Sequence, residues 1–124
     1  MVNESKTVAV IGASPNPGRY SYLAVQLLSE AGHGVYALGR RAGTIGTVPI
    51  VTDWPEKIDD LHTVTLYLGA KNQPELYEYI LSLKPKRIVF NPGAENPELK
   101  QLVRQSGIEV EEACTLVLVK TNQF

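Results

Sequence analysis

Residues 7–21 read TVAVIGASPNPGRYS, an uninterrupted apolar run followed by a loop that is rich in glycine and proline. The run Thr7–Ile11 has the length and the β-branched composition of a buried strand. From Ser21 onwards, apolar side chains recur with helical spacing until Gly32 and Gly34 end the pattern. A strand, a loop and a helix in this order predict the first unit of a parallel α/β sheet.

The same alternation continues along the rest of the chain. Further strands are predicted at Val35–Leu38, Val48–Val51, His62–Leu68, Lys86–Phe90 and Ile108–Glu111. The glycine-rich segment Gly39–Pro49 is predicted to be a surface loop. One helix is expected to be capped by Asn72 with Pro74 in its first turn, and another to open at Asn96.

Length and patterning together indicate the fold class. A chain of 124 residues has room for one domain. Strands that alternate with helices over short connections form a parallel sheet that is covered on both faces. We therefore expect a single domain over residues 1–124, with an α/β, Rossmann-like three-layer α/β/α fold and a parallel sheet of five to six strands.

Composition and charge exclude several kinds of protein. Twelve basic residues against thirteen acidic ones give a formal charge of -1, so no global positive field attracts nucleic acid or an anionic membrane. No apolar run reaches the roughly 18 residues of a membrane span, and residues 1–6 lack the apolar region of a signal peptide. A cytoplasmic location is expected. Cys114 is the single cysteine, which leaves too few thiolates for a zinc site, so no metal is predicted.

The loop Gly12–Ser21 combines glycines, a hydroxyl group and an arginine immediately before a helix. The first backbone N–H groups of a helix have no partner within it, and the helix dipole adds partial positive charge, so the loop suits a phosphate. Gly12 permits a close approach to the ligand, and Arg19 supplies a forked donor. The alternative is a tight turn that any parallel α/β domain needs, with Ser21 capping the helix.

The second predicted strand bears on the kind of nucleotide. Proteins that bind NAD place an acidic residue near the end of this strand, whereas this chain has Arg40 and Arg41 there. Two arginines fit a nucleotide with an extra ribose phosphate, which is either NADP, at the 2′ position, or coenzyme A (CoA), at the 3′ position. The alternative is that both arginines are solvated loop charges.

Four segments together resemble the small CoA-binding proteins that are similar to the N-terminal domain of the succinyl-CoA synthetase alpha subunit. They are Val8–Ser21, Gly32–Tyr36, Asn91–Glu98, and Gly107-Ile108 with Cys114. The resemblance covers nearly the whole chain. It implies CoA or an acyl-CoA whose phosphates lie over Ser14, Arg19, Tyr20 and Ser21, and it implies no established catalytic activity. Because the synthetase domain works with a partner subunit, it also suggests a protein partner or a homodimer.

Two later loops, 67–71 and 91–96, could frame the pantetheine arm of such a ligand. Gly93 and the helix start at Asn96 are predicted to offer a second set of free N–H donors, unless Asn96 is simply an N-cap. Tyr67 could instead be a core residue, and Lys71 a solvated lysine. The candidate ligand-binding residues are Gly12, Ala13, Ser14, Arg19, Tyr20, Ser21, Arg40, Arg41, Tyr67, Gly69, Gly93 and Asn96.

No catalytic residue is predicted. His33, expected on the surface, and His62 both belong at the opposite end of the sheet, so a nucleophile at the ligand loops would lack the usual base. Glu95, Glu111 and Glu112 could act as acids or bases only if one were unusually desolvated.

The expected function is therefore non-catalytic binding of CoA or an acyl-CoA, as a carrier, sensor or regulatory module. One alternative is a small NADP-dependent oxidoreductase, although a chain of this length lacks a companion substrate domain. Another is a redox sensor that uses Cys114 with the CoA thiol, against the simpler interpretation of Cys114 as a buried, inert thiol.

Overall fold

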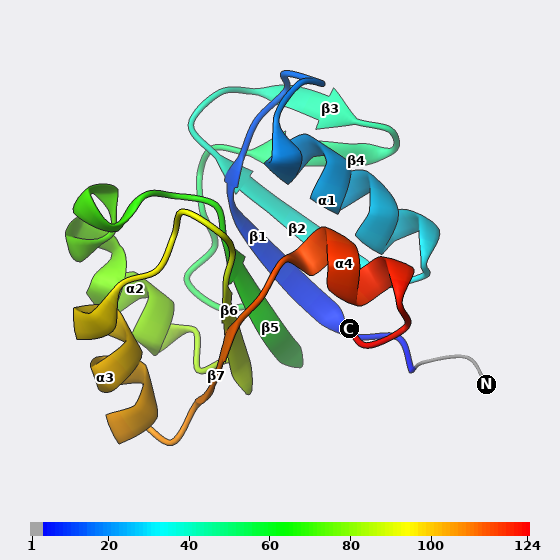
Figure 1. Cartoon of the computed structure of the whole chain (residues 1–124). Coiled ribbons are helices and arrows are strands. Elements are labelled where there is room, and N and C mark those ends of the chain that lie inside the picture. The colour runs from blue at the N-terminus through cyan, green and yellow to red at the C-terminus, as the bar shows by residue number, and fades with distance from the viewer. Residues whose placement is uncertain (1–3) are drawn as a thin grey trace.

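Seven strands form one sheet in the computed structural model, which describes residues 4–124 (Figure 1). The strands are β1 (Thr7–Ala13), β2 (Gly34–Gly39), β3 (Gly43–Ile45), β4 (Val48–Val51), β5 (Leu61–Leu66), β6 (Arg87–Phe90) and β7 (Glu109–Glu112). Their order across the sheet is β3-β4-β2-β1-β5-β6-β7, and all neighbours are parallel except β3 and β4. This confirms the predicted Rossmann-like α/β fold.

The number of strands differs from the prediction because the segment Gly39–Pro49 is not only a loop. Gly43–Ile45 forms β3, which turns back at Gly46 and pairs antiparallel with β4. Gly46 has a φ of +61°, a left-handed conformation that favours glycine in tight turns. A strand of three residues leaves too short a pattern to be recognised without its partner.

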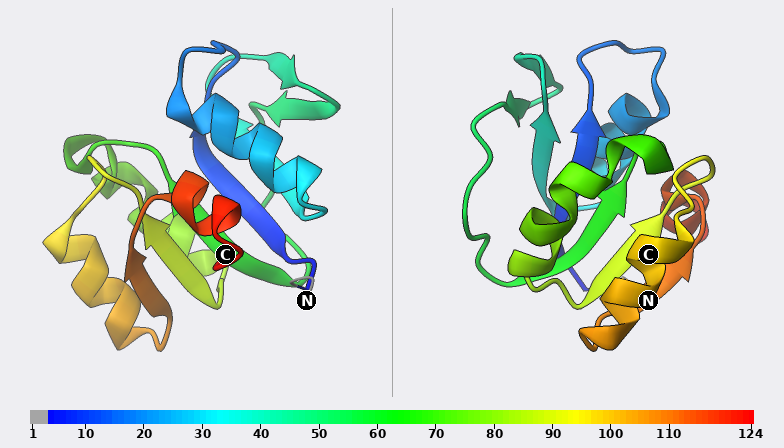
Figure 2. Two further views of the ribbon diagram at one scale, coloured as in Figure 1. Left: turned by 45° about the vertical axis from the view of Figure 1, so that its right-hand side comes forward. Right: turned by 90° about the vertical axis from the view of Figure 1, so that its left-hand side faces the viewer.

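Helices cover both faces of the sheet (Figure 2). They are α1 (Tyr20–Glu30), α2 (Tyr77–Ser82), α3 (Pro97–Gln105) and α4 (Thr115–Lys120). Helices α1 and α4 pack on one face, against Val8 and Val10 of β1, whereas α2 and α3 pack on the other, against Ala9 and Ile11. Because these four side chains of β1 are fully buried and alternate between two cores, β1 is the centre of the fold. No helix within residues 4–124 is long and apolar enough to span a bilayer.

The helix expected after Asn72 begins later than predicted. Asn72 ends a 3-10 turn, η1 (Ala70–Asn72), and Pro74 opens a second one, η2 (Pro74–Leu76), before α2 starts at Tyr77. The buried Gln73 lies between the two turns, and its Nε2 donates to the carbonyl oxygens of Leu68 and Ala94, at 2.9 and 2.8 Å. These tertiary hydrogen bonds stabilise the two 3-10 turns. A regular α-helix, which the local sequence favours, therefore does not form at these residues.

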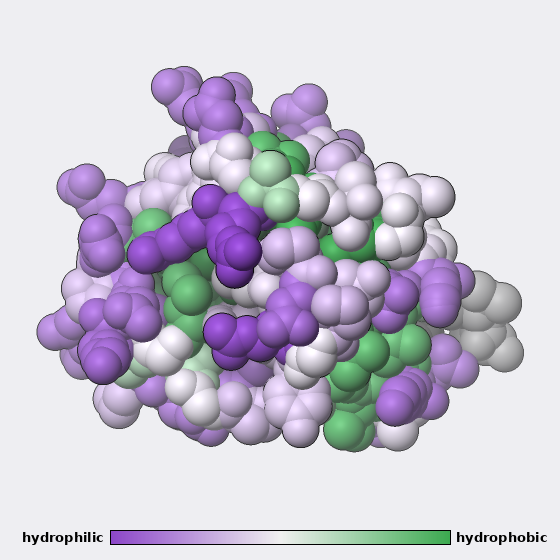
Figure 3. Space-filling view, turned by 90° about the horizontal axis from the view of Figure 1, so that it is seen from above, coloured by the Kyte–Doolittle hydropathy of each residue, from purple (hydrophilic) through white to green (hydrophobic). Residues whose placement is uncertain are grey.

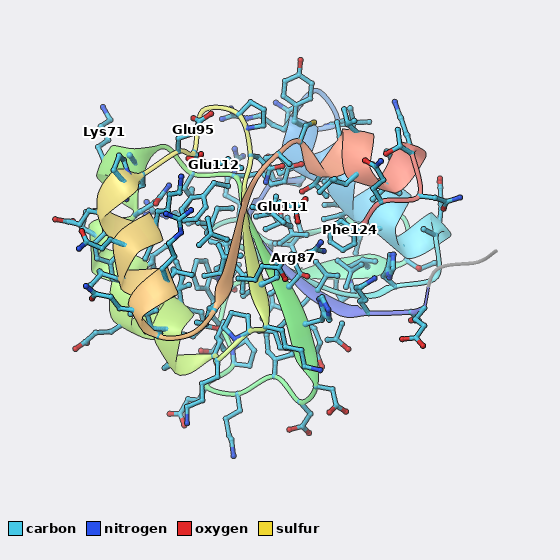
Figure 4. The ribbon with its side chains drawn as sticks, turned by 60° about the horizontal axis from the view of Figure 1, so that its bottom comes forward. Lys71, Arg87, Glu95, Glu111, Glu112 and Phe124 are labelled. Carbon is cyan, nitrogen blue, oxygen red and sulfur yellow. The ribbon has the colours of Figure 1, made fainter. Side chains whose placement is uncertain are left out.

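Helix α4 and the residues after it were not predicted, and they change the surroundings of His33. The ring of Phe124 packs against His33, with 5.4 Å between ring centroids, and lies 4.5 Å below the guanidinium carbon of Arg87 (Figure 4). His33 is therefore buried, and the expectation of a surface histidine is wrong. Its Nδ1 accepts a hydrogen bond of 3.0 Å from the Lys6 backbone N–H.

Candidate functional site

A cavity of about 410 Å³ opens at the carboxyl edge of the sheet, and the loops after β1, β2, β4, β5 and β6 line it. Strand β1 lies at its centre, where the chain first turns to β2 on one side and later to β5 on the other. Such a reversal of strand order is the usual ligand position in an open α/β sheet. Figure 3 looks down on this edge and shows strongly hydrophilic side chains standing beside an apolar region.

The cavity brings together the predicted site residues with the exception of Asn96. It is lined by Gly12, Ala13, Ser14, Arg19, Tyr20, Ser21, Arg40, Arg41, Tyr67, Gly69 and Gly93 from the predicted set. The other lining residues are Pro15, Gly39, Trp54, Leu68, Pro92 and Ala94. All of them except Trp54 lie in segments that the sequence singled out, but none was a candidate contact.

The loop after β1 is held by its own hydrogen bonds. The Asn16 N–H donates to Ser14 Oγ at 3.1 Å, and the Gly18 N–H donates to Asn16 Oδ1 at 2.9 Å. Such side-chain turns fix the backbone of a loop without a ligand. Gly12 has a φ of +97°, and a Cβ there would lie 2.9 Å from the carbonyl oxygen of Tyr67. The absence of a side chain at Gly12 thus allows the backbone of Tyr67, directly after β5, to lie close to the backbone of Gly12.

Helix α1 begins without a side-chain cap. Its N-cap residue is Arg19, in extended conformation, and no side chain in the described part of the chain accepts from the first turn. Ser21, the alternative cap from the sequence, is instead the second residue of the helix and is buried. Because the start of α1 lies at the cavity, its backbone N–H groups are available to an anion there.

Three arginines stand at the rim of the cavity. Arg19, Arg40 and Arg41 are all exposed and all line it. Arg40 forms an ion pair with Glu75 at 3.9 Å, but both side chains are about three-quarters exposed, at 73% and 76%. An exposed pair of this length is weak. The arginines therefore remain free to turn toward a phosphate in the cavity.

The second set of free N–H donors, predicted at Gly93 and Asn96, is not present. The Gly93 N–H donates to Glu95 Oε1 at 2.8 Å. Asn96 caps α3, because its Oδ1 accepts from the N–H groups of Glu98 and Leu99 at 3.1 and 3.3 Å. Its Nδ2 donates to Gln73 Oε1 and to the Tyr77 hydroxyl. Asn96 is thus a buried structural residue, and its N-cap interpretation is confirmed.

A buried polar network lies beneath the loops after β5 and β6. Asn91 Nδ2 donates to Thr65 Oγ1 at 2.6 Å, and Asn91 Oδ1 accepts from the Thr115 N–H at 2.8 Å. The hydroxyls of Thr65 and Thr115 share a hydrogen bond of 2.7 Å. Asn91 thereby ties the end of β6 to β5 and to the start of α4, directly before Pro92, which lines the cavity.

Tyr67 is one of the residues that line the cavity, and its hydroxyl is buried. The hydroxyl is buried near Thr115, but Thr115 already shares a hydrogen bond with Thr65, and the described residues offer Tyr67 no partner of good geometry. Burial raises the pKa of Tyr67 well above its usual value, with a smaller contribution from Cys114, so the phenol stays protonated. Cys114 itself is partly buried and is not among the residues that line the cavity.

The other charged residues singled out in the sequence are not among those that line the cavity, although the Glu95 carboxylate accepts from Gly93, which does. Lys71 and Glu95 are exposed (Figure 4). Glu111 pairs with Arg87 at 3.3 Å, and Glu112 pairs with Lys100 at 3.1 Å. Along the part of the chain that the structure describes, the cavity lining contains no carboxylate, histidine, lysine or cysteine. The lining thus offers cations and backbone donors, and the Glu95 carboxylate is held next to it by Gly93.

Comparisons with known proteins agree with this geometry. A family model described as a CoA binding domain matches residues 6–120. An uncharacterized protein of known crystal structure is 43% identical, and the match covers 98% of this chain and 100% of that chain with a TM-score of 0.94. No curated protein matches.

Two more distant structures share the fold. A protein from Thermus thermophilus is 22% identical, with a TM-score of 0.80 and coverage of 97% of this chain and 91% of that chain. A hypothetical protein from Pyrococcus horikoshii OT3 is 24% identical, with a TM-score of 0.80 and coverage of 94% and 83%.

Proposed function

Because the chain belongs to the family of CoA-binding domains, we propose that it binds coenzyme A or an acyl-CoA in the cavity at the carboxyl edge of its sheet. It does so without catalysing a reaction, as a carrier, sensor or regulatory module that acts with a protein partner or a second copy of the chain. The observation that carries this proposal is the uncapped start of α1, which opens into a cavity rimmed by three arginines.

The start of α1 is the place for the diphosphate. Its first N–H groups and its dipole favour a negative charge, and Arg19 adds a forked donor next to them. Ser14 and Ser21 stand on either side of this loop, and both line the cavity. A diphosphate needs several donors at once, and this part of the cavity supplies them.

Arg40 and Arg41 are the partners of the extra ribose phosphate. They follow β2, the neighbour of β1 in the sheet, so they lie beside the diphosphate position. The opposite wall, made by Leu68, Gly69, Pro92 and Ala94, is uncharged and suits the pantetheine arm. A ligand with several phosphates at one end and a long neutral arm at the other matches both walls.

The cavity favours binding over catalysis. Acid–base and nucleophilic reactions need a titrating group within reach of the reacting atoms. The side chains of the described lining that titrate are arginines and two tyrosines, and the pKa of Tyr67 is raised by burial. Neither histidine helps, since His33 precedes β2 and His62 lies near the start of β5, both at the amino edge of the sheet.

Isothermal titration of the purified protein with CoA, dephospho-CoA and NADP tests the proposal. We expect micromolar binding of CoA that weakens by about tenfold or more without the 3′-phosphate, because a charged hydrogen bond contributes about 1.5–3 kcal/mol. An Arg40→Ala/Arg41→Ala variant should lose a similar factor for CoA and little for dephospho-CoA. Lys71→Ala, which removes an exposed cation outside the lining, is the matched control and should bind CoA normally.

The same titration separates the alternative function. Strong NADP binding with no heat from CoA would overturn the proposal and favour a small NADP-dependent oxidoreductase. The two arginines alone do not distinguish the two ligands, because each carries an extra ribose phosphate.

A further inference from the structure

Trp54 is the one tryptophan of the chain, and it lies at the cavity without a role in the phosphate or pantetheine contacts above. It follows β4, the strand next to β2, so it stands on the same side of the cavity as Arg40 and Arg41. Its side chain is half-buried. It is the large planar aromatic group of that side of the lining.

The indole of Trp54 is held in a fixed orientation. Its Nε1 donates to the Gly39 carbonyl oxygen at 3.0 Å. Its ring packs against Tyr79, with 5.5 Å between ring centroids and 47° between the planes. The Tyr79 hydroxyl in turn donates to the Pro55 carbonyl oxygen at 2.7 Å, which ties α2 to the residue after Trp54. A ring fixed in this way loses little conformational entropy when a ligand packs on it.

The fixed ring can recognise only certain chemical groups. The single polar hydrogen of the indole is already used by Gly39, so Trp54 offers the ligand an apolar aromatic surface and no hydrogen bond. Such a surface binds a planar aromatic group by stacking and does not favour a phosphate or an amide. The phosphate partners Arg40 and Arg41 come directly after Gly39 in the chain.

From these contacts we infer that Trp54 is the wall on which the adenine base of the nucleotide stacks. The inference rests on the proposed function and adds an orientation to it. The base lies against Trp54, the ribose phosphate meets Arg40 and Arg41, the diphosphate meets the start of α1, and the pantetheine arm runs toward Leu68 and Pro92. Trp54 also packs against one core of the protein, so the test has to separate stacking from folding.

Tryptophan fluorescence provides a direct reading, because Trp54 is the sole source of indole emission. The probes are CoA, its base-containing half adenosine 3′,5′-bisphosphate, and its other half 4′-phosphopantetheine. We expect CoA and adenosine 3′,5′-bisphosphate to quench the emission in a saturable way. Binding of 4′-phosphopantetheine should leave the emission almost unchanged.

Three variants, titrated by calorimetry because two of them lack the indole, complete the experiment. Trp54→Leu should weaken the binding of CoA and of adenosine 3′,5′-bisphosphate by about tenfold, with little effect on 4′-phosphopantetheine, because stacking on a base contributes about 1–3 kcal/mol. Trp54→Phe keeps an aromatic face without the hydrogen bond to Gly39 and should retain most of the affinity. Tyr36→Leu removes an exposed aromatic side chain outside the lining and is the matched control.

The outcomes distinguish this inference from the proposed function. CoA binding with unchanged emission, or with equal affinity in Trp54→Leu, would overturn the role of Trp54 and leave the proposed function intact. If the wild-type protein binds no CoA but NADP quenches the emission, Trp54 remains the base wall and the proposal of CoA is overturned. Equal losses for both halves of CoA in Trp54→Leu and Trp54→Phe would point to a folding defect and would also count against the inference.

Discussion

Gly39 ends β2 at a crowded point of the site. A Cβ at this position would lie 2.4 Å from the Ala13 carbonyl oxygen and 2.9 Å from Cγ2 of Ile50. The register between β1 and β2 shifts just before Ala13, which brings its carbonyl against Gly39. The Gly39 carbonyl also accepts the hydrogen bond from Trp54 Nε1. Gly39 therefore contacts both Ala13, at the end of β1, and Trp54.

Substitution of Gly39 should therefore be costly. We expect Gly39→Ala to lower the free energy of unfolding by about 1–3 kcal/mol, because the backbone of Ala13 has to move. The measurement is urea unfolding. Gly69→Ala is the control, since Gly69 also lines the cavity but a Cβ there meets no atom within 4 Å. Its φ of -63° suits alanine, so a loss in Gly69→Ala as large as in Gly39→Ala would contradict this explanation.

At the scale of residues, much of the cavity lining could be predicted from the sequence. Arg40 follows the end of β2 and Arg19 lies in the loop after β1, and the loops after parallel strands meet at one edge of the sheet. Trp54 could not be found in this way, because its strand is short and its partners Gly39 and Tyr79 are distant in the sequence.

The C-terminal segment acts as a cover for the amino edge of the sheet. After α4, Phe124 packs between His33 and Arg87, and Arg87 is further held by Thr63 and Glu111 at 3.1 and 3.3 Å. Burial lowers the pKa of His33, and the nearby charges of Lys6 and Arg87 lower it further. Both effects favour the neutral form of the His33 imidazole in the folded protein.

This arrangement gives the stability a defined pH dependence. The pKa of His33 is below 6.5 in the folded protein and close to 6.5 in the unfolded chain, so the unfolded chain binds more protons as the pH falls. The contribution of neutral His33 to the free energy of unfolding is fully present above about pH 6.5 and is lost as the pH falls below that value. His62 is shifted in the same direction, chiefly by burial and Arg87.

Urea unfolding at about pH 7.5 and about pH 5.5 measures the effect. The wild-type protein should be less stable at the lower pH, and His33→Gln should show a smaller difference between the two conditions. The contribution of His62 remains in that variant. An unchanged difference in His33→Gln would show that His33 is not the group responsible.

At the scale of elements, the helices and strands whose own sequence carries a clear pattern were predicted best. The strands β1, β5 and β6 are rich in apolar and β-branched residues, and α3 has its Asn-Pro-Glu start. The strand β3 was missed because it has only three residues, and the late start of α2 and the helix α4 were missed because each depends on distant partners. Helix α4 is composed largely of leucine and valine, a pattern that helices and strands share when they are short and apolar.

At the scale of the whole molecule, the two edges of the sheet differ. The cavity lies at the carboxyl edge, and the amino edge is covered by packed side chains. The carboxyl ends of the parallel strands carry the cavity with its arginines and aromatic wall. The amino ends carry the two histidines, Arg87 and Phe124, and the Phe124 ring contacts both His33 and Arg87. This polarity follows from the parallel sheet, in which every strand of the centre points the same way.

The central claim is that the start of α1 receives the phosphates of CoA. Amide chemical shifts of ¹⁵N-labelled protein during titration with CoA test it most directly. The account predicts the largest saturable shifts at the N–H groups of Tyr20 and Ser21, with smaller ones at Ala13 and Ser14 and almost none at His33. Saturable shifts centred on the amino edge of the sheet, or no shifts at the start of α1 when CoA is bound, would contradict it.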